Sequence, residues 1–375
     1  MKLKLIIHII LVAILISSCR VAKLKNDITG IWYFDTRLNN EYANNSGFSY
    51  SILFDFQKEG NVLIKYLSEK RDTVFKWNIQ NDSLIFDNQK SRILDINKDS
   101  IVISYGGNLG YTVILKKAKT YNINKTTDEI KQILKKNIWR NNQSNATYEY
   151  FEDDILLLQN KGYDYKLKDT SINLNIDTWK VLKYDNFFFY YTPNNPFSNE
   201  IHQFINVNDS EFTISGNYHN KEIKFKTIKF NNAKWNKEDL IGKWICKNTN
   251  NKAYAIPYNE NLKPNNRRIF FNGNLTFEFK EDELICKIDT FTYAKKIKWK
   301  LSKDKNSIIL KYTLEDKSQE SNYYSCAGII NLNDTLFTLK LFDNIITTTN
   351  ERNIPMKIYL NLIQDFKKIT NLNNK

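Results

Sequence analysis

The sequence has few of the residues that interrupt regular structure. Its 375 residues include only 5 Pro and 11 Gly, which excludes collagen-like chains and chains dominated by flexible linkers. Histidine is also scarce, at 3 residues, and no apolar run reaches the roughly 18 residues of a membrane-spanning helix. Hydrophobic residues make up 42% and aromatic residues 14%, so intrinsic disorder is excluded as well. The abundance of β-branched and aromatic residues predicts an all-β protein, and the length allows about two to four domains.

The chain is strongly basic, with a formal net charge of +14. A charge of this size can attract anionic partners such as lipid headgroups, glycan phosphates or nucleic acid. The lysines, however, are spread along the whole chain and alternate with apolar residues, as on the solvent face of strands. We therefore predict solvated strand faces and no nucleic-acid partner.

The N-terminus has the layout of a signal peptide. Lys2 and Lys4 form a basic start, Leu5–Ile16 is apolar, and Ser17 and Ser18 precede Cys19. This order resembles the bacterial lipoprotein box, in which small residues precede a cysteine that is lipidated and becomes the new N-terminus. The resemblance implies a lipoprotein signal peptide over residues 1–19, a lipid anchor on Cys19, and the membrane as a partner. The alternative is an ordinary secretory signal with a chance cysteine.

The residues after Cys19 indicate the location of the protein in the cell. Residues 20–25 are basic, whereas lipoproteins exported to the cell surface in some bacterial groups are similar to one another in an acidic run at this place. We therefore expect an outer-membrane lipoprotein of the bacterial envelope that faces the periplasm. An oxidising envelope permits one disulfide among Cys246, Cys286 and Cys326, and three buried thiols are the alternative.

Tryptophan reveals an internal repeat. Trp32, Trp139 and Trp244 recur at intervals of 107 and 105 residues, and each opens a short strand-like run. A second tryptophan follows in each copy, and then a turn in which Asn is followed by Ser or Thr before an apolar strand. The full set of tryptophan signatures is Trp32, Trp77, Trp139, Trp179, Trp244 and Trp299.

Three modules follow from the repeat: residues 20–124, 125–235 and 236–375. Each begins with a short helical turn, and Thr126–Glu129 has the spacing of a capping box. We expect residues 231–235 to form a link between modules. The Lys- and Glu-rich stretch over 314–324 is expected to be an exposed loop in the third module.

Two of the copies open with Gly-x-Trp, at Gly30 and Trp32 and at Gly242 and Trp244. This opening resembles that of lipocalin-like domains in many bacterial envelope lipoproteins. The resemblance implies three tandem antiparallel up-and-down barrels, with the tryptophan at the closed end of each. Asn137 stands where the second copy should have glycine, so that module is expected to be the most distorted. β-Sandwiches or half-open sheets are the alternative architecture.

Residues for chemistry are few. His202 and His219 are the only histidines after the signal segment, and we interpret both as ordinary strand or loop residues. The acidic triplets 152–154 and 281–283 fit solvated turns. Residues 95–100 superficially resemble a calcium loop but lack glycine at its sixth position. We therefore predict no catalytic residue, no metal site and no cofactor.

One aromatic run is harder to assign. Five consecutive aromatic residues in a strand must point to both faces of the sheet, which would present some of them outside the core. They form either a contact surface for sugar, lipid or protein, or a strand that a neighbouring module covers on both faces. The run is Phe187, Phe188, Phe189, Tyr190 and Tyr191.

These features predict a non-enzymatic, envelope-anchored binding or scaffold protein. In one mechanism a barrel carries a small hydrophobic ligand, because eight strands enclose room for one. In the other, which we favour because modules of about 105 residues are small, aromatic side chains fill the interiors and the outer surfaces contact envelope proteins. An enzyme acting on an envelope polymer is the alternative of another class.

Overall fold

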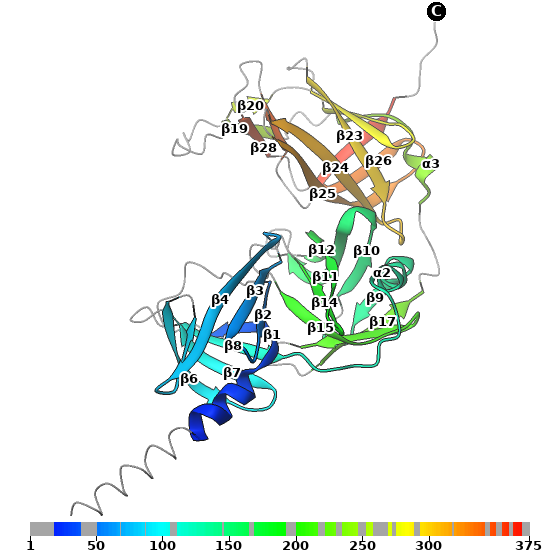
Figure 1. The fold of residues 1–375 in the computed structure, drawn as a ribbon. Coiled ribbons are helices and arrows are strands. Elements are labelled where there is room, and N and C mark those ends of the chain that lie inside the picture. The colour runs from blue at the N-terminus through cyan, green and yellow to red at the C-terminus, as the bar shows by residue number, and fades with distance from the viewer. Residues whose placement is uncertain are drawn as a thin grey trace, which may run out of the picture. The chain divides into compact units, whose positions relative to one another are not determined.

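The computed structural model confirms an all-β protein built from antiparallel sheets (Figure 1). Its two compact units are described separately: residues 1–145, 150–156 and 177–227 form the first, and residues 146–149, 157–176 and 228–375 the second. The structure describes residues 19–38, 51–67, 69–86, 88–105, 111–144, 146–164, 169–192, 200–216, 222–229, 235–246, 253–257, 269–271, 275–288, 293–316, 319–341, 346–349, 355–359 and 363–369.

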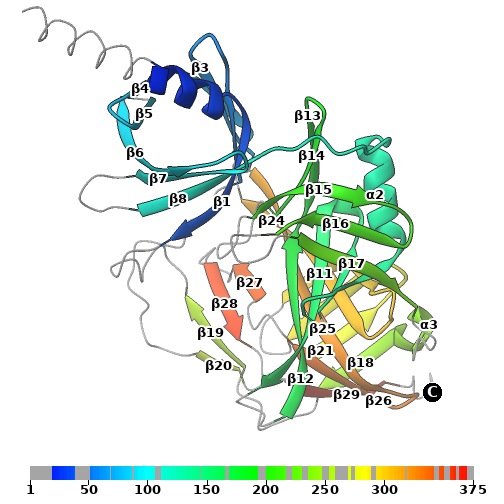
Figure 2. The ribbon, with the colours of Figure 1, turned by 90° about the horizontal axis from the view of Figure 1, so that it is seen from below.

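The first sheet is a closed barrel in which eight strands pair in sequence order and the last pairs with the first. A helix over residues 19–28 precedes it and lies across one end (Figure 2). The strands are β1 (Gly30–Leu38), β2 (Ile52–Phe56), β3 (Asn61–Tyr66), β4 (Arg71–Gln80), β5 (Ser83–Phe86), β6 (Gln89–Ile96), β7 (Ser100–Tyr105) and β8 (Tyr111–Lys117).

Alternation along β4 shows why this stretch forms a barrel strand. Trp77 and Ile79 are buried in the interior, while Lys76 and Asn78 are exposed outside. Because successive side chains of a strand point to opposite faces, the period-two pattern places one apolar face inward. The last strand of the barrel, β8, spans Tyr111–Lys117.

The second sheet has nine strands and is barrel-like, but it does not close. Its order is β12-β11-β10-β9-β17-β16-β15-β14-β13. The helix α2 (Thr127–Lys136) precedes it, and the strands are β9 (Ile138–Asn141), β10 (Thr147–Tyr150), β11 (Ile155–Asp164), β12 (Asp169–Thr178), β13 (Lys180–Tyr184), β14 (Phe187–Tyr191), β15 (Ile201–Val207), β16 (Glu211–Ser215) and β17 (Glu222–Ile228), with a 3-10 helix over Glu152–Asp154.

The opening of the second sheet has a simple topological origin. In the first barrel one continuous strand, β4, pairs with β3 and β5 and carries Trp77. The counterpart of Trp77 is Trp179, whose main-chain N donates to Asp154 O at 2.8 Å, as Trp77 N donates to Gly60 O at 2.8 Å. Trp179 lies between β12 and β13, the two strands that end the sheet. The second sheet is therefore a barrel opened where its fourth strand is interrupted.

The third sheet is again a closed barrel, of order β18-β21-β22-β23-β24-β25-β26-β29. A separate four-stranded sheet has the order β20-β19-β28-β27. After α3 (Lys237–Leu240), the strands are β18 (Gly242–Cys246), β19 (Ala253–Pro257), β20 (Ile269–Phe271), β21 (Leu275–Phe279), β22 (Glu283–Ile288), β23 (Tyr293–Leu301), β24 (Ser307–Asp316), β25 (Gln319–Leu332), β26 (Leu336–Leu341), β27 (Ile346–Thr349), β28 (Pro355–Tyr359) and β29 (Ile363–Lys368).

Two sequence expectations about the third module were wrong. Residues 314–316 and 319–324 are strand and not loop, because β24 and β25 pair along them, with Leu314 opposite Ser321. Charged residues occur in strands as well as in loops, so composition alone could not separate the two. Trp235, expected in a link, is 7% exposed and belongs to the core of the third barrel. Its Nε1 donates to Leu332 O at 3.1 Å.

The polar turn occurs in all three sheets with the same hydrogen bonds. Asn97 Oδ1 accepts from the main-chain N of Asp99 at 2.8 Å and of Ser100 at 2.9 Å. Asn208 and Asn333 each accept the corresponding pair of bonds. The asparagine side chain thus satisfies the backbone donors that start the next strand. This use of Asn97 explains the residue pattern that superficially resembled a calcium loop.

Candidate functional site

Each Gly-x-Trp-type tryptophan joins a strand to the helix before it. Trp32 Nε1 donates to Ile28 O at 2.6 Å, and Trp244 Nε1 donates to Leu240 O at 2.8 Å. Trp139 Nε1 likewise donates to the carbonyl of a helical residue, Leu134, at 2.8 Å. All three indoles are fully buried, and each bond satisfies a helix-end carbonyl that would otherwise lack a partner.

The two signature glycines adopt a conformation that L side chains rarely take. Gly30 has φ +124° and Gly242 has φ +132°. Each glycine lies against a lysine of the barrel's last strand: an added Cβ would be 3.3 Å from Lys117 Cε and 3.1 Å from Lys368 Cε. The missing side chain therefore leaves room for the lysine stem.

The same two lysines lie over the signature tryptophans. Lys117 Nζ is 5.1 Å from the ring centre of Trp32, and Lys368 Nζ is 5.1 Å from that of Trp244. This is cation–π geometry. Burial lowers the pKa of Lys117, and the opposing charge of Asp27 partly offsets that effect. No motif in the sequence singled out either lysine, although each is the last residue of the final strand of its barrel.

The second copy lacks both the glycine and the lysine. Asn137 has φ −122°, and its Nδ2 donates to Asp209 O at 3.1 Å. The position of Lys117 is taken by Thr227, whose main-chain N donates to Ser210 O as Lys117 N donates to Asp99 O. The second copy has no lysine side chain at this place, and the residue at the start of its strand, Asn137, has an ordinary negative φ.

The hydrogen bond of the second tryptophan also distinguishes the second copy from the first and third. Trp77 Nε1 donates to Gln57 O at 3.1 Å, and Trp299 Nε1 donates to Lys280 O at 2.9 Å. Trp179 is 1% exposed, but its Nε1 has no hydrogen-bond partner among the residues that the structure describes. Because the strand of the second sheet is interrupted at Trp179, this indole lacks the hydrogen bond that the other two make.

The aromatic run forms β14, and its side chains alternate between two buried surroundings. Phe189 is fully buried and meets Tyr33 of the first barrel at a ring distance of 5.7 Å. Tyr190 points the other way and meets Phe204 at 6.3 Å. The exposed contact surface that was one sequence interpretation is therefore wrong for Phe188–Tyr191, which are at most 7% exposed. A strand buried on both faces, the other interpretation, fits.

We call the contact between the first barrel and the β13–β17 part of the second sheet the junction. Both partners belong to the first compact unit. Leu53 and Ile114 are buried on the barrel side, and Tyr191 and Ile201 on the sheet side. Strand β1 is apolar on both faces because Trp32 fills the interior and Tyr33 the junction. Consecutive apolar residues on this strand are the sequence pattern that could have indicated the junction.

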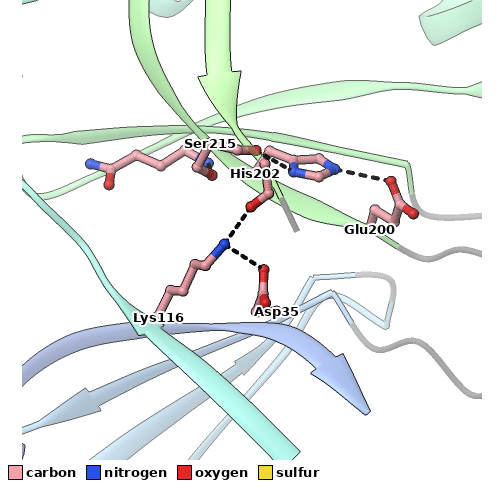
Figure 3. Close-up of polar contacts among 7 residues, drawn as sticks. Asp35, Lys116, Glu200, His202 and Ser215 are labelled. Carbon is pink, nitrogen blue, oxygen red and sulfur yellow. Dashed lines mark hydrogen bonds and ion pairs between the residues drawn. The ribbon is translucent and has the colours of Figure 1, made fainter. Parts of the chain in front are cut away.

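Charged groups at the junction pair with one another (Figure 3). Lys116 Nζ lies 3.0 Å from Asp35 Oδ1 and donates to Gly216 O at 2.5 Å. The Asp35 side chain is 3% exposed, so the pair is largely desolvated. Removing either partner would leave a buried charge without compensation. On the other flank of the junction, Tyr184 Oη donates to Asp55 Oδ2 at 2.9 Å.

His202 lies in the sheet beside the junction and uses both ring nitrogens (Figure 3). Nδ1 is 2.7 Å from Ser215 O, and Nε2 is 3.0 Å from Glu200 Oε2. Carbonyl and carboxylate oxygens are acceptors, so satisfying both contacts requires a proton on each nitrogen. Burial raises the pKa of Glu200, but the hydrogen bond and charge of His202 outweigh it and the pKa is lowered. His219 lies outside the described residues.

Two tyrosines of the junction have raised pKa values because their side chains are buried. Burial raises the pKa of Tyr33 strongly, although a hydrogen bond to Ser215 opposes the shift. Burial also raises the pKa of Tyr191 to about 12. A cleft of about 630 Å³ opens at the junction, and its lining includes Tyr33, Ile114 and Lys116. Asp99 and Lys119, which also line it, pair at 3.0 Å.

Other residues singled out in the sequence lie apart from the junction. Cys19 is exposed at the start of the N-terminal helix, whereas Cys246, Cys286 and Cys326 are buried in the third module. No disulfide joins cysteines within the described ranges. Among the same residues, no group of three or more His, Cys, Asp or Glu side chains could hold a metal ion. No helix that the structure describes is long and apolar enough to cross a membrane.

Comparisons with known proteins identify no family for this chain. No protein-family model matches the chain, and no curated protein matches it. Among solved structures, it is similar to the isotype 1 transferrin binding protein B from serogroup B Neisseria meningitidis. That match has a TM-score of 0.21 and 8% sequence identity, and covers 89% of this chain and 67% of the other. A TM-score of this size carries no functional argument.

Proposed function

We propose that this chain is a lipid-anchored protein of the bacterial envelope whose three lipocalin-like modules form a non-enzymatic scaffold. It binds envelope proteins through its outer surfaces, and its barrel interiors are structural. The anchor is Cys19, and the modules face the periplasm from the outer membrane. A carrier of a small hydrophobic ligand is the alternative.

The observation that carries this proposal is the filling of the interiors by aromatic rings. In the first barrel, the rings of Phe56 and Trp77 are 5.2 Å apart in edge contact. In the third, Phe279 and Trp299 repeat that contact at 5.0 Å, and Phe277 stacks on Phe366 at 4.7 Å. Such rings occupy the space that a carrier would keep for its ligand.

The junction supports a scaffold for a second reason. Buried apolar side chains and a desolvated ion pair join the first barrel to the sheet of the second module, so these parts act as one body. Parts joined in this way keep their outer surfaces at fixed positions relative to one another. The polar groups of the junction are bound to one another, which supports a structural role for them rather than chemistry.

The lipid anchor is supported by sequence and exposure together. The signal-like segment ends at Cys19, and the residue is exposed where the helix begins. Basic residues 20–25 support the periplasmic side over the cell surface.

Native mass spectrometry tests the scaffold against the carrier. We expect residues 20–375 made in a bacterial periplasm to show the mass of the chain alone, and crosslinking in the native envelope to capture protein partners. An excess mass that disappears on solvent extraction would contradict filled interiors and favour the carrier. The same chain refolded from denaturant is the control, since refolding removes copurified molecules.

Metabolic labelling with an alkyne fatty acid tests the anchor. We expect label on the wild-type chain and on Cys286→Ala, and none on Cys19→Ala. Cys286 is the matched control because it is buried in the third module. Label that persists on Cys19→Ala would place the acyl chains elsewhere.

A further inference from the structure

The N-terminal helix is docked on the first barrel from its first turn. Arg20 pairs with Asp82 of the β4–β5 turn at 2.9 Å, one residue after Cys19. Val21 and Leu24, on the same side of the helix, pack against the barrel core. The contact with the barrel therefore begins immediately after the residue that would carry the lipid.

The far end of the helix is fixed as well. Lys25 Nζ lies 5.8 Å from the ring centre of Trp77, and Lys117 Nζ donates to Asp27 O at 3.0 Å. Ile28 is fully buried, and its carbonyl accepts the indole bond of Trp32. With both ends held, the helix belongs to the barrel and is not a tether.

The helix marks one end of the barrel, which we call the helix end. Besides residues 19–28 it contains the turns over 57–60, 81–82 and 97–99. The contacts of Arg20 with Asp82, and of Lys117 N with Asp99 O, join these parts. The turn over 67–70 lies at the opposite end, because β3 runs from residue 61 at the helix end to residue 66.

We infer that the helix end of the first barrel lies directly on the lipid headgroups of the membrane. This inference rests on the proposed lipidation of Cys19. Acyl chains on that residue hold it at the bilayer surface, and only about 3.8 Å of chain separates it from docked Arg20. The membrane is the one occupant for this surface, and the opposite end of the barrel points away from it.

Exposed charge on the helix end fits an anionic headgroup layer. Lys23, Lys58 and Lys98 are exposed, as are the acids Glu59 and Asp95. The two half-exposed acids of the turns, Asp82 and Asp99, pair with Arg20 and Lys119. Each lysine close to an anionic surface contributes about 1 kcal/mol to binding at moderate salt. These contacts are too weak to hold the barrel alone, but they suffice to orient a barrel that the acyl chains already keep there.

Depth-dependent fluorescence quenching tests the inference on the lipidated full-length chain. Lys58→Cys places a thiol-reactive fluorophore at the helix end, and Glu69→Cys places it at the opposite end as the matched control. The protein is reconstituted in vesicles of phosphatidylethanolamine and phosphatidylglycerol with a nitroxide on the headgroup. The two ends are about 20 Å apart, the length of a six-residue strand, so quenching should be about threefold stronger at position 58.

The outcomes separate this inference from the proposed anchor. Intact mass shows whether Cys19 carries acyl chains in the same sample. With acyl chains present, equal quenching at both positions would overturn the orientation and leave the anchor standing. Unmodified Cys19 would overturn both. A variant with a Gly/Ser linker inserted between Cys19 and Arg20 should abolish the difference, and a difference that survives the linker would also contradict direct apposition.

Discussion

Gln203 holds the main chain of Lys119 from both sides. Its Oε1 accepts from Lys119 N at 2.9 Å, and its Nε2 donates to Lys119 O at 2.5 Å. Gln203 is 3% exposed on β15, and Lys119 follows the last strand of the first barrel. One amide thus fastens the exit of the barrel to the neighbouring sheet through two partly buried hydrogen bonds.

Removing this amide should weaken the junction. We expect Gln203→Ala to lower the free energy of unfolding by about 1–3 kcal/mol, because it removes two partly buried hydrogen bonds to the main chain of Lys119. Urea unfolding followed by tryptophan fluorescence measures the loss. Gln89→Ala, at an exposed position of β6, is the control and should change stability by less than about 0.5 kcal/mol. Equal stability of the two variants would contradict the fastening role.

Substitution by alanine at the position before the x-Trp pair should destabilise the first copy more than the second. Gly30→Ala should destabilise by about 1–3 kcal/mol, since it combines a positive φ with a clash against Lys117. Asn137→Ala, at the equivalent position, starts from a φ of −122° and so carries no such strain. It removes the exposed hydrogen bond to Asp209 O, and about 0.5–1 kcal/mol is expected. Thermal unfolding compares the two, and a larger effect at Asn137 would refute the explanation.

Stability should depend on pH through Glu149. Burial raises its pKa to about 8, although Lys303 opposes the shift, and its Oε2 has no partner within the described residues. The folded state then keeps this proton to a higher pH than the unfolded state. Its contribution to the free energy of unfolding therefore falls as pH rises from about 5 to about 8, and levels off above that.

The isosteric variant Glu149→Gln tests this assignment. It should flatten that slope and unfold with a free energy about 1–3 kcal/mol higher at pH 8, because it keeps the acceptor for Lys303 N without the buried charge. Chemical unfolding across pH 5–9 gives the comparison, and Glu152→Gln is the exposed control. A Gln variant less stable than wild type at pH 8 would show that the ionised carboxylate is needed.

The three buried cysteines should react only after unfolding. Cys246, Cys286 and Cys326 are 6%, 5% and 1% exposed. A maleimide reagent applied to residues 20–375 without reductant should label none of them in buffer and all three in denaturant. The mass of the labelled chain gives the number. A single labelled thiol in denaturant would instead reveal a disulfide.

The fold class and several local features can be predicted from the sequence alone. Apolar and polar residues alternate around Trp77 and Trp299, as the barrel strands β4 and β23 require, and the capping box at Thr126 and Glu129 is confirmed. These features depend on neighbours within a few residues, so a linear pattern contains them. The absence of glycine at Asn137 likewise marked the second copy as different.

What packs against the outer face of each strand depends on tertiary contacts. The aromatic run on β14 could face a partner or another module, and it is buried because the outside of the first barrel offers Tyr33 and Leu53 to it. Lys119 and Gln203 are 84 residues apart, and no local pattern relates them. Whether a strand's second face meets solvent or another sheet depends on chain segments distant in sequence, because burial is decided by what packs there and not by the strand's own period.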